Sequence, residues 1–205
     1  KNKYTVNSII KNFKKNNRCI IIANGPSAAK FDLKKIPNSI DIITLNQFYK
    51  SEISNHLKSN FHIVNEPFDG NLPEDIYSDI LNKCLRHESD CYIFHPNAFR
   101  YLKVNANKNV FFSKNSLLKI FSMEFGSISL NKRMPLFKCT GTASLVYAIA
   151  IGYQEIYVLG MDQNQLSEKT QTNRHFYKED NTHIYDIQKL ANYYERIISK
   201  SETIL

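Results

Sequence analysis

The stretch from Ile20 to Ser27, IIIANGPS, constrains the fold of this chain more than any other. An apolar run made mainly of β-branched residues stops at an asparagine, a glycine and a proline, a pattern typical of a buried strand that leaves into a tight loop. Gly25 can adopt backbone angles that other residues avoid and lets a ligand approach the main chain, while Pro26 stiffens the turn. In open α/β sheets, such a loop after the first strand binds nucleotides and phosphates.

Taken alone, these residues are also compatible with an ordinary connection from strand to loop that binds no ligand. The loop holds one glycine, so it is not the glycine-rich loop of dinucleotide-binding folds, and no Gly-Lys-Ser/Thr follows, so it is not a Walker loop. Two further strands with the same kind of ending favour the ligand-binding interpretation.

Those two predicted strands, IDIITLN and FHIVN, end in Asn46 and Asn65, as the first ends in Asn24. An asparagine side chain offers two hydrogen-bond donors and an acceptor without a charge, which suits a base edge, a ribose hydroxyl or a phosphate oxygen. Asparagine is also a common turn former, so a single one carries little information. Three in succession indicate a ligand site.

The segment 137–162, FKCTGTASLVYAIAIGYQEIYVLGMD, predicts a loop, a helix and a strand in that order. The small residues 139–142 open an apolar helix through Ile151, Gly152 ends it, and IYVLG follows as a central strand. The free amides of the first helical turn favour a phosphate or carboxylate beside the sheet. The strand leaves through residues 160–162.

Strands and helices alternate along the whole chain. The other expected elements are helices over 4–13, 72–87, 97–102, 116–125 and 186–200 and strands over 91–95 and 109–112, with a polar basic loop over 126–135. The alternation predicts a single Rossmann-like α/β domain over residues 1–205, doubly wound, with a mainly parallel sheet and helices on both faces.

Within the helix over 72–87, Ile76, Ile80, Leu81 and Cys84 share the expected apolar face. The polar segment 162–182 is long for a connection and is a candidate lid or acceptor loop. The last helix should cover the sheet. The final TIL is typical of a strand that begins, so we expect the native chain to continue past Leu205.

The composition suits a soluble protein. The chain has 205 residues, 42% of them hydrophobic, with no apolar run of membrane-spanning length and no signal-peptide pattern, so we expect a cytoplasmic location. The four cysteines form no CxxC pair, which favours reduced core thiols over disulfides or zinc. His56, His62, His87 and His95 have no motif around them, and we expect structural roles for them.

The formal net charge of +8 favours anionic partners, including the acidic face of a membrane. The densest basic group is Lys11, Lys14, Lys15 and Arg18, for which a solvated basic helix is the alternative to a binding patch. No DxD motif occurs, so we expect neither a metal nor another cofactor.

Several separated pieces match one known family in order and spacing. They are NGPS at 24–27, NQFY at 46–49, VNEP at 64–67, TG at 140–141, AIAIGYQEIYVLGMD at 148–162 and HIYDIQKL at 183–190. Over residues 19–194 the chain resembles the bacterial sialyltransferases that extend lipooligosaccharide, which have one nucleotide-binding domain and use a CMP-sugar donor.

The resemblance implies an inverting, metal-independent glycosyltransferase of lipooligosaccharide or capsule biosynthesis, with a histidine general base just before the last helix. By position that base is His183, after an HFY motif at His175. The donor-binding residues expected from the strand ends and the resemblance are Asn24, Gly25, Pro26, Ser27, Asn46, Gln47, Asn65, Thr140, Gly141, Thr142, Gly160, Asp162, His175, Tyr177 and Tyr185.

The expected partners are a CMP-sugar and a glycan or glycolipid acceptor, and we expect no nucleic acid. Peripheral association with a membrane and a homo-oligomer are both open. Gln163, Asn164 and Gln165 stand where the family has phosphate-binding tyrosines, so sialic acid and a related CMP-activated sugar are both open as donors.

Two other function classes also remain. One is an ATP-dependent enzyme similar to pterin diphosphokinases, and the other is a non-enzymatic nucleotide- or RNA-binding module.

Overall fold

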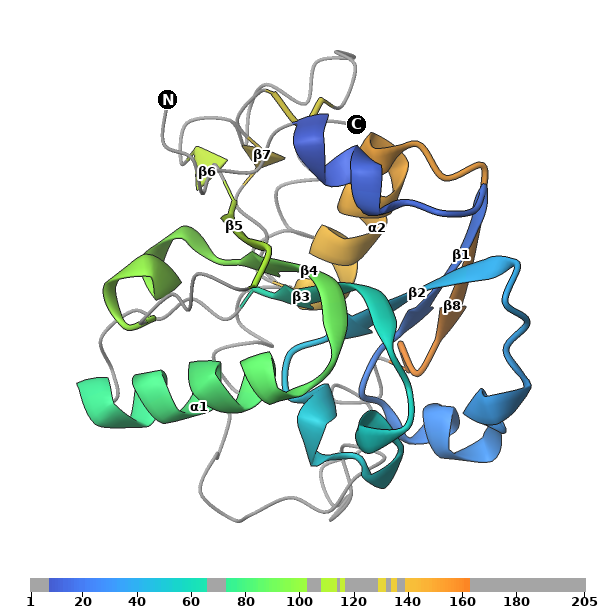
Figure 1. Cartoon of the computed structure of the whole chain (residues 1–205), viewed down its shortest axis with the longest axis horizontal. Coiled ribbons are helices and arrows are strands. Elements are labelled where there is room, and N and C mark those ends of the chain that lie inside the picture. The colour runs from blue at the N-terminus through green and yellow to red at the C-terminus, as the bar shows by residue number, and fades with distance from the viewer. Residues whose placement is uncertain are drawn as a thin grey trace, which may run out of the picture.

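A six-stranded parallel sheet forms the centre of the molecule (Figure 1). The computed structural model describes residues 8–65, 73–102, 108–113, 115–116, 129–131, 134–135 and 139–162. The strands of the main sheet are β1 (Arg18–Ile22), β2 (Ile40–Leu45), β3 (Ser59–Val64), β4 (Ser89–Phe94), β5 (Val110–Phe112) and β8 (Glu155–Leu159), and β6 (Asn115–Ser116) and β7 (Met134–Pro135) form a separate short pair.

Two α-helices and six 3-10 helices connect these strands among the described residues. They are η1 (Ser8–Phe13), η2 (Pro26–Lys30), η3 (Leu33–Lys35), η4 (Phe48–Lys50), η5 (Glu52–Asn55), α1 (Glu74–Arg86), η6 (Pro96–Arg100) and α2 (Thr140–Ile151). No helix in this part of the chain is long and apolar enough to span a membrane.

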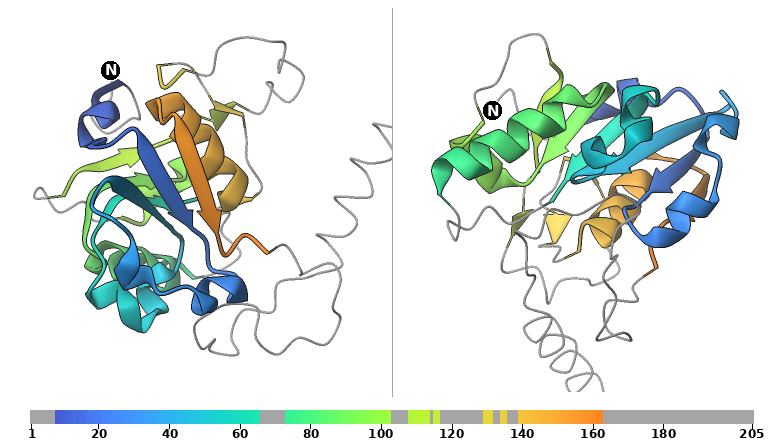
Figure 2. Two further views of the ribbon diagram at one scale, coloured as in Figure 1. Left: turned by 90° about the vertical axis from the view of Figure 1, so that its right-hand side faces the viewer. Right: turned by 90° about the horizontal axis from the view of Figure 1, so that it is seen from below.

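The strand order in the sheet is β5-β4-β3-β2-β1-β8, and every neighbouring pair is parallel. The chain moves outward from β1 to β5 and then returns to place β8 on the other side of β1 (Figure 2, left). The strand order therefore reverses between β1 and β8. In open α/β sheets this reversal opens a crevice at the carboxyl ends of the strands, where ligands bind.

Helices cover both faces of the sheet, as the sequence predicts. On one face α2 and η1 pack on a cluster that includes Ile21, Ile43 and Ile63, and on the other face α1 packs on Tyr92 and Phe94 (Figure 2, right). Every residue of β3 is buried, as expected for a parallel strand covered on both sides. The predicted doubly wound α/β fold is confirmed.

The prediction that IYVLG is a central strand is wrong within the described sheet, because β8 lies at its edge. Tyr157 and Val158 are each 44% exposed. A continuous apolar run does not distinguish a covered central strand from an edge strand, since the run records only local composition.

Three of the predicted helices are present but differ from the prediction in their buried face or in their type. Ile76 is 40% exposed in α1, and the buried face consists instead of Tyr77, Ile80, Leu81, Cys84 and Leu85. The segments 8–13 and 96–100 are 3-10 helices. Ser116, the first residue of the helix predicted over 116–125, belongs to β6, and Met134 and Pro135 of the loop predicted over 126–135 form β7. The rest of that helix, half of that loop, the helix over 186–200, the lid beyond Asp162 and the chain end lie outside the described residues.

Candidate functional site at the carboxyl edge of the sheet

The loop after β1 lies against the residues that follow β8. The amide of Ala23 donates to the carbonyl of Leu159, and the amide of Gly25 donates to the carbonyl of Gly160, both at 2.8 Å. Gly25 has an ordinary φ of −72°, so the freedom of glycine to adopt unusual backbone angles is not used at this position. A Cβ on Gly25 would lie 2.5 Å from the Gly160 carbonyl oxygen. Glycine is required at this position by the close approach of two backbones.

Gly160 is the partner in this approach and has a left-handed φ of 72°. A Cβ at Gly160 would stand 2.4 Å from the carbonyl oxygen of Ala23. The two glycines therefore let β1 and β8 open into loops that remain in contact, at the point where the strand order reverses.

Asp162 fixes the next turn of the same loop. Its Oδ2 accepts a 2.7 Å hydrogen bond from the amide of Ser27, in the first turn of η2, which Pro26 opens. This bond orients the backbone of the loop after β1. Because a carboxylate bonded to an amide is a strong acceptor, Asp162 restrains the loop.

Asn46 joins three elements at the same edge. Its Oδ1 accepts from the Thr140 hydroxyl at 3.1 Å and from the Asn65 amide at 3.3 Å. Asn46 has a left-handed φ of 45°, a conformation that asparagine adopts more readily than most residues. The ends of β2 and β3 and the start of α2 therefore meet at one side chain.

The third asparagine of the row is tied to its neighbour. Asn24 donates through Nδ2 to the carbonyl of Leu45 at 3.2 Å, which links the end of β1 to the end of β2. Asn65 is 7% exposed. The three predicted strand endings thus lie on adjacent parallel strands at one edge.

The first turn of α2 faces this row. Cys139 caps the helix in an extended conformation without a side-chain cap bond. The amides of the first turn have no partner within a helix, so together with the hydroxyl of Thr142 they can donate to an anion. A Cβ on Gly141 would lie 2.9 Å from Met161 Cε, so a small residue lets the helix start beside the end of β8.

The structure therefore brings together most of the predicted donor-binding residues. Gln47 directly follows Asn46, and Thr142 is exposed in the first turn of α2. The predicted residues His175, Tyr177, His183 and Tyr185 lie outside the described residues.

One residue at this edge was assigned a purely structural role from the sequence. His95 follows β4 directly, and its amide donates to the carbonyl of Val64 at 2.8 Å, so it stands beside Asn65. The available signal was its place after the strand CYIF, equivalent to the place of the asparagines after theirs.

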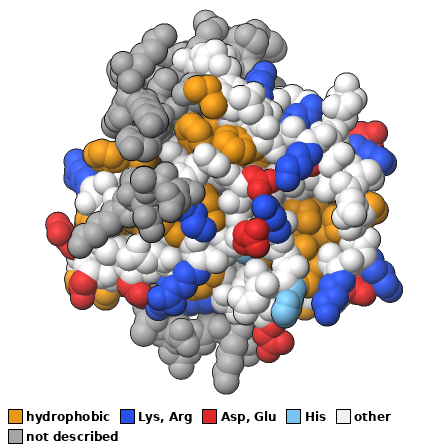
Figure 3. Space-filling model, in the orientation of Figure 1, with side chains coloured by type: hydrophobic (Ala, Val, Ile, Leu, Met, Phe, Trp, Pro, Cys, Tyr) orange, Lys and Arg blue, Asp and Glu red, His pale blue; other side chains and the backbone are white. Residues whose placement is uncertain are grey.

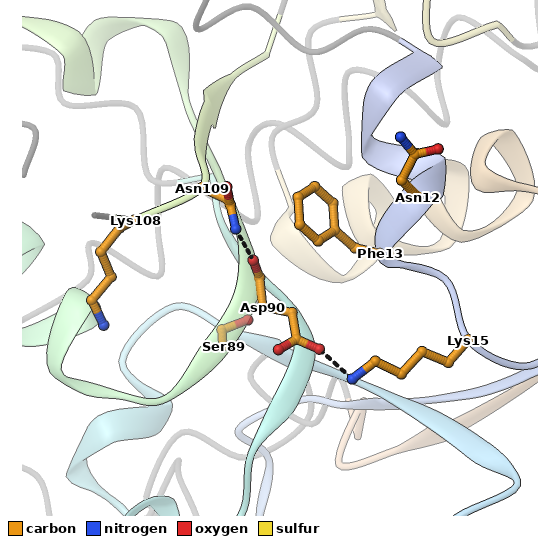
Figure 4. Close-up of a pocket in the computed structure, with 7 residues that line it drawn as sticks. All are labelled: Asn12, Phe13, Lys15, Ser89, Asp90, Lys108 and Asn109. Carbon is orange, nitrogen blue, oxygen red and sulfur yellow. Dashed lines mark hydrogen bonds and ion pairs between the residues drawn. The ribbon is translucent and has the colours of Figure 1, made fainter. Parts of the chain in front are cut away.

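The opposite edge of the sheet holds a depression of about 380 Å³. It is lined by Asn12, Phe13, Lys15, Ser89, Asp90, Lys108 and Asn109 (Figure 4). Lys15 and Lys58 bond the Asp90 carboxylate at 2.6 and 2.9 Å. Partial burial of Asp90 acts to raise its pKa, but the two lysine bonds outweigh it and lower the pKa. This depression lies where strands begin, away from the asparagine row.

No protein-family model matches this sequence, and no curated protein matches it. The chain is similar to solved structures of sialyltransferases. The CstII enzyme from Campylobacter jejuni with the substrate analogue CMP-3FNeuAc shares 24% identity over 87% of this chain and 69% of that chain, with a TM-score of 0.47.

Two other structures give similar values. CST-II in complex with a trisaccharide acceptor and CMP has 22% identity over 85% of this chain and 71% of that chain, with a TM-score of 0.46. The monofunctional α-2,3-sialyltransferase Cst-I from Campylobacter jejuni has 20% identity over 93% of this chain and 66% of that chain, with a TM-score of 0.48. At these identities the similarity concerns the fold and assigns no activity to this chain.

Proposed function

We propose that this protein is a glycosyltransferase that moves a sugar from a CMP-activated donor to a glycan or glycolipid acceptor. The observation that carries the proposal is the row of Asn24, Asn46 and Asn65 beside the first turn of α2, at the reversal between β1 and β8. The order of the sequence motifs, NGPS, NQFY, VNEP, TG and GMD, agrees with this assignment.

The site supplies neutral donors and acceptors. Asparagine amides can read the edge of a base and the ribose hydroxyls, and the first turn of α2 can hold a single phosphate. The carboxylate of Asp162 is bonded to the Ser27 amide. A CMP leaving group carries one phosphate, for which amides and hydroxyls suffice. We therefore propose transfer without a metal.

In the proposed reaction the acceptor hydroxyl attacks the anomeric carbon with inversion, while the bond to the phosphate breaks. His183 accepts the proton of that hydroxyl, since a histidine with a near-neutral pKa suits this role. The amides of residues 140–142 and the hydroxyl of Thr142 stabilise the charge that develops on the departing CMP. His175 contacts the phosphate or the loop over it.

Nucleotide titration tests the donor assignment. We expect CMP to bind about tenfold tighter than UMP, because uracil reverses the hydrogen-bonding groups that a cytosine site would read. Calorimetric titration with CMP, UMP, ADP and GDP, with and without Mg²⁺, provides the measurement. Equal affinities for CMP and UMP would contradict the proposal, and Mg²⁺-dependent binding of ADP alone would favour the diphosphokinase class.

Replacement of His183 tests the mechanism. His183→Ala should lower turnover with a CMP-sugar by roughly a hundredfold to ten-thousandfold, the usual contribution of a general base, with the Kd of CMP nearly unchanged. His56→Ala is the matched control, because His56 is an exposed histidine far along the chain from the motif. If His183→Ala kept normal turnover and His175→Ala abolished it at constant CMP affinity, the two roles would be exchanged.

A further inference from the structure

His95 has a fixed orientation at the carboxyl edge. Its side chain accepts a 3.2 Å hydrogen bond from the amide of Asn97 through Nδ1. A ring nitrogen that accepts an amide carries no hydrogen, so the hydrogen of the neutral ring is on Nε2. Nε2 has no hydrogen-bond partner among the described residues. The ring therefore presents one unused donor while the residue is only 6% exposed.

The environment keeps this donor uncharged. Burial lowers the pKa of His95 to about 4, so the ring is neutral at physiological pH. Because Nε2 of this neutral ring already carries the hydrogen, it cannot accept a proton as a base. It can donate one hydrogen bond to an oxygen atom.

The place of His95 in the strand order indicates which ligand oxygen can accept this hydrogen bond. Three strand spacings separate the end of β4 from the end of β1, about 14 Å at the usual spacing in a sheet. The proposed function places the nucleotide at the reversal between β1 and β8 and its phosphate by Thr140 and Asn46. On that placement the transferred sugar extends toward Asn65, and the next position along the edge is His95.

We propose that His95 is a specificity-determining residue that donates its Nε2 hydrogen to a hydroxyl or ring oxygen of the acceptor glycan. This proposal rests on the proposed glycosyl transfer and assigns the acceptor to the β4 side of the carboxyl edge.

Two substitutions separate this role from simple capping of η6. His95→Asn keeps an acceptor near the position of Nδ1 and deletes Nε2, whereas His95→Gln keeps a donor near the position of Nε2. We expect His95→Asn to raise the KM for the acceptor about three- to tenfold, the value of one neutral hydrogen bond, and to leave the Kd of CMP unchanged. His95→Gln should recover most of the loss, and His56→Asn should have no effect.

The measurement is steady-state transfer from CMP-sugars to a panel of galactose-, glucose- and N-acetylglucosamine-terminated oligosaccharides. The increase in KM should be constant between pH 6 and pH 8, because the donor does not titrate there. If both variants changed KM equally, or only the melting temperature responded, His95 would be a cap and the proposal would be wrong.

A second readout does not need turnover. In the full chain with labelled histidine, the Nε2 resonance of His95 should shift when the same oligosaccharides are added to the CMP-bound protein. Failure of the wild-type protein to transfer any sugar, with this shift present, would overturn the proposed function and keep the glycan contact. Transfer by the wild-type protein without the shift would overturn the assignment of His95.

Discussion

Asn46 combines a backbone and a side-chain requirement at one position. Its φ of 45° favours glycine or asparagine, and its Oδ1 holds Thr140 and Asn65 in place. Because both donors bind the oxygen of the amide, the nitrogen end is directed away from them. The residue therefore fixes the shape of the site and the polarity that it offers to a ligand.

Two substitutions of Asn46 distinguish these requirements. Asn46→Gly keeps the left-handed conformation and loses the amide, whereas Asn46→Ala loses both. We expect Asn46→Ala to be less stable than Asn46→Gly by about 1 kcal/mol in urea unfolding, and both to lose CMP affinity by a similar factor. Equal stability of the two variants would show that backbone strain at this position is unimportant.

At the scale of elements, α1 and β3 meet through a buried polar cluster. His62 of β3 and His87 at the end of α1 both contact the Thr44 hydroxyl, at 2.8 and 3.1 Å. His87 also bonds Ser59 and the carbonyl of Ser54. These bonds tie a helix end, two strands and η5 together without a charge.

The cluster makes the stability depend on pH. Burial lowers the pKa of His87 to about 4 and lowers that of His62 well below 6.5, while Glu88 acts to raise the His87 value and Lys108 to lower it. Between the ordinary histidine pKa of 6.5, which applies to the unfolded state, and the lowered pKa of the folded state, the folded state therefore binds fewer protons than the unfolded state. Stability is complete above pH 6.5 and falls as the pH decreases toward 4.

For His87 we expect a loss of about 2 kcal/mol on going from pH 7 to pH 5. Urea unfolding at several pH values measures it. His87→Gln should make this dependence shallower whatever its effect on the stability at pH 7, and His56→Gln, at an exposed position, should leave the slope unchanged. A flat profile for the wild-type protein would contradict the neutral buried pair.

At the scale of the whole molecule, the two edges of the sheet have different tasks. The carboxyl edge carries the row of Asn24, Asn46 and Asn65, and the amino edge carries the stabilising carboxylate of Asp41, which is 1% exposed. This carboxylate accepts hydrogen bonds from the amides of Lys15 and Asn16, from Asn16 Nδ2 and from the Tyr153 hydroxyl at 2.7 to 3.2 Å. It joins β2 to the segments that precede β1 and β8.

Because Asp41 and the asparagine row lie at opposite edges of the sheet, substitutions around Asp41 should lower stability without changing ligand affinity. Asp41→Asn should cost roughly 2–3 kcal/mol of the free energy of unfolding, Tyr153→Phe less, and the double variant less than the sum, since the two share one bond. The Kd of CMP should stay within twofold in each folded variant. A large loss of affinity at constant stability would contradict this division.

Basic side chains are spread over the molecule. On the face drawn in Figure 3, Lys and Arg side chains alternate with acidic and neutral ones and form no single patch. Of the cluster expected near the N-terminus, Lys15 pairs with Asp90, and Lys14 donates to the carbonyl of Gly152. These two lysines therefore make contacts that stabilise the fold, in addition to facing solvent.

The sequence by itself determined the elements and the edge at which the site would lie. Apolar β-branched runs that stop at Asn24, Asn46 and Asn65 predict strands with polar ends, and alternation with helices makes the sheet parallel. Parallel strands bring equivalent ends to one edge, so local patterns suffice to predict the row. The roles of His183 and of the CMP donor stay predictions.

Only the tertiary structure decided which ends are neighbours and what each contact requires. The place of β8 beside β1 at the edge of the described sheet, the approach of Gly25 to Gly160 and the bond from Thr140 to Asn46 join residues that are far apart in the chain. Periodicity and caps record the conformation of a few consecutive residues, whereas strand order and buried hydrogen bonds depend on packing between distant segments. The unused donor of His95 became visible for the same reason.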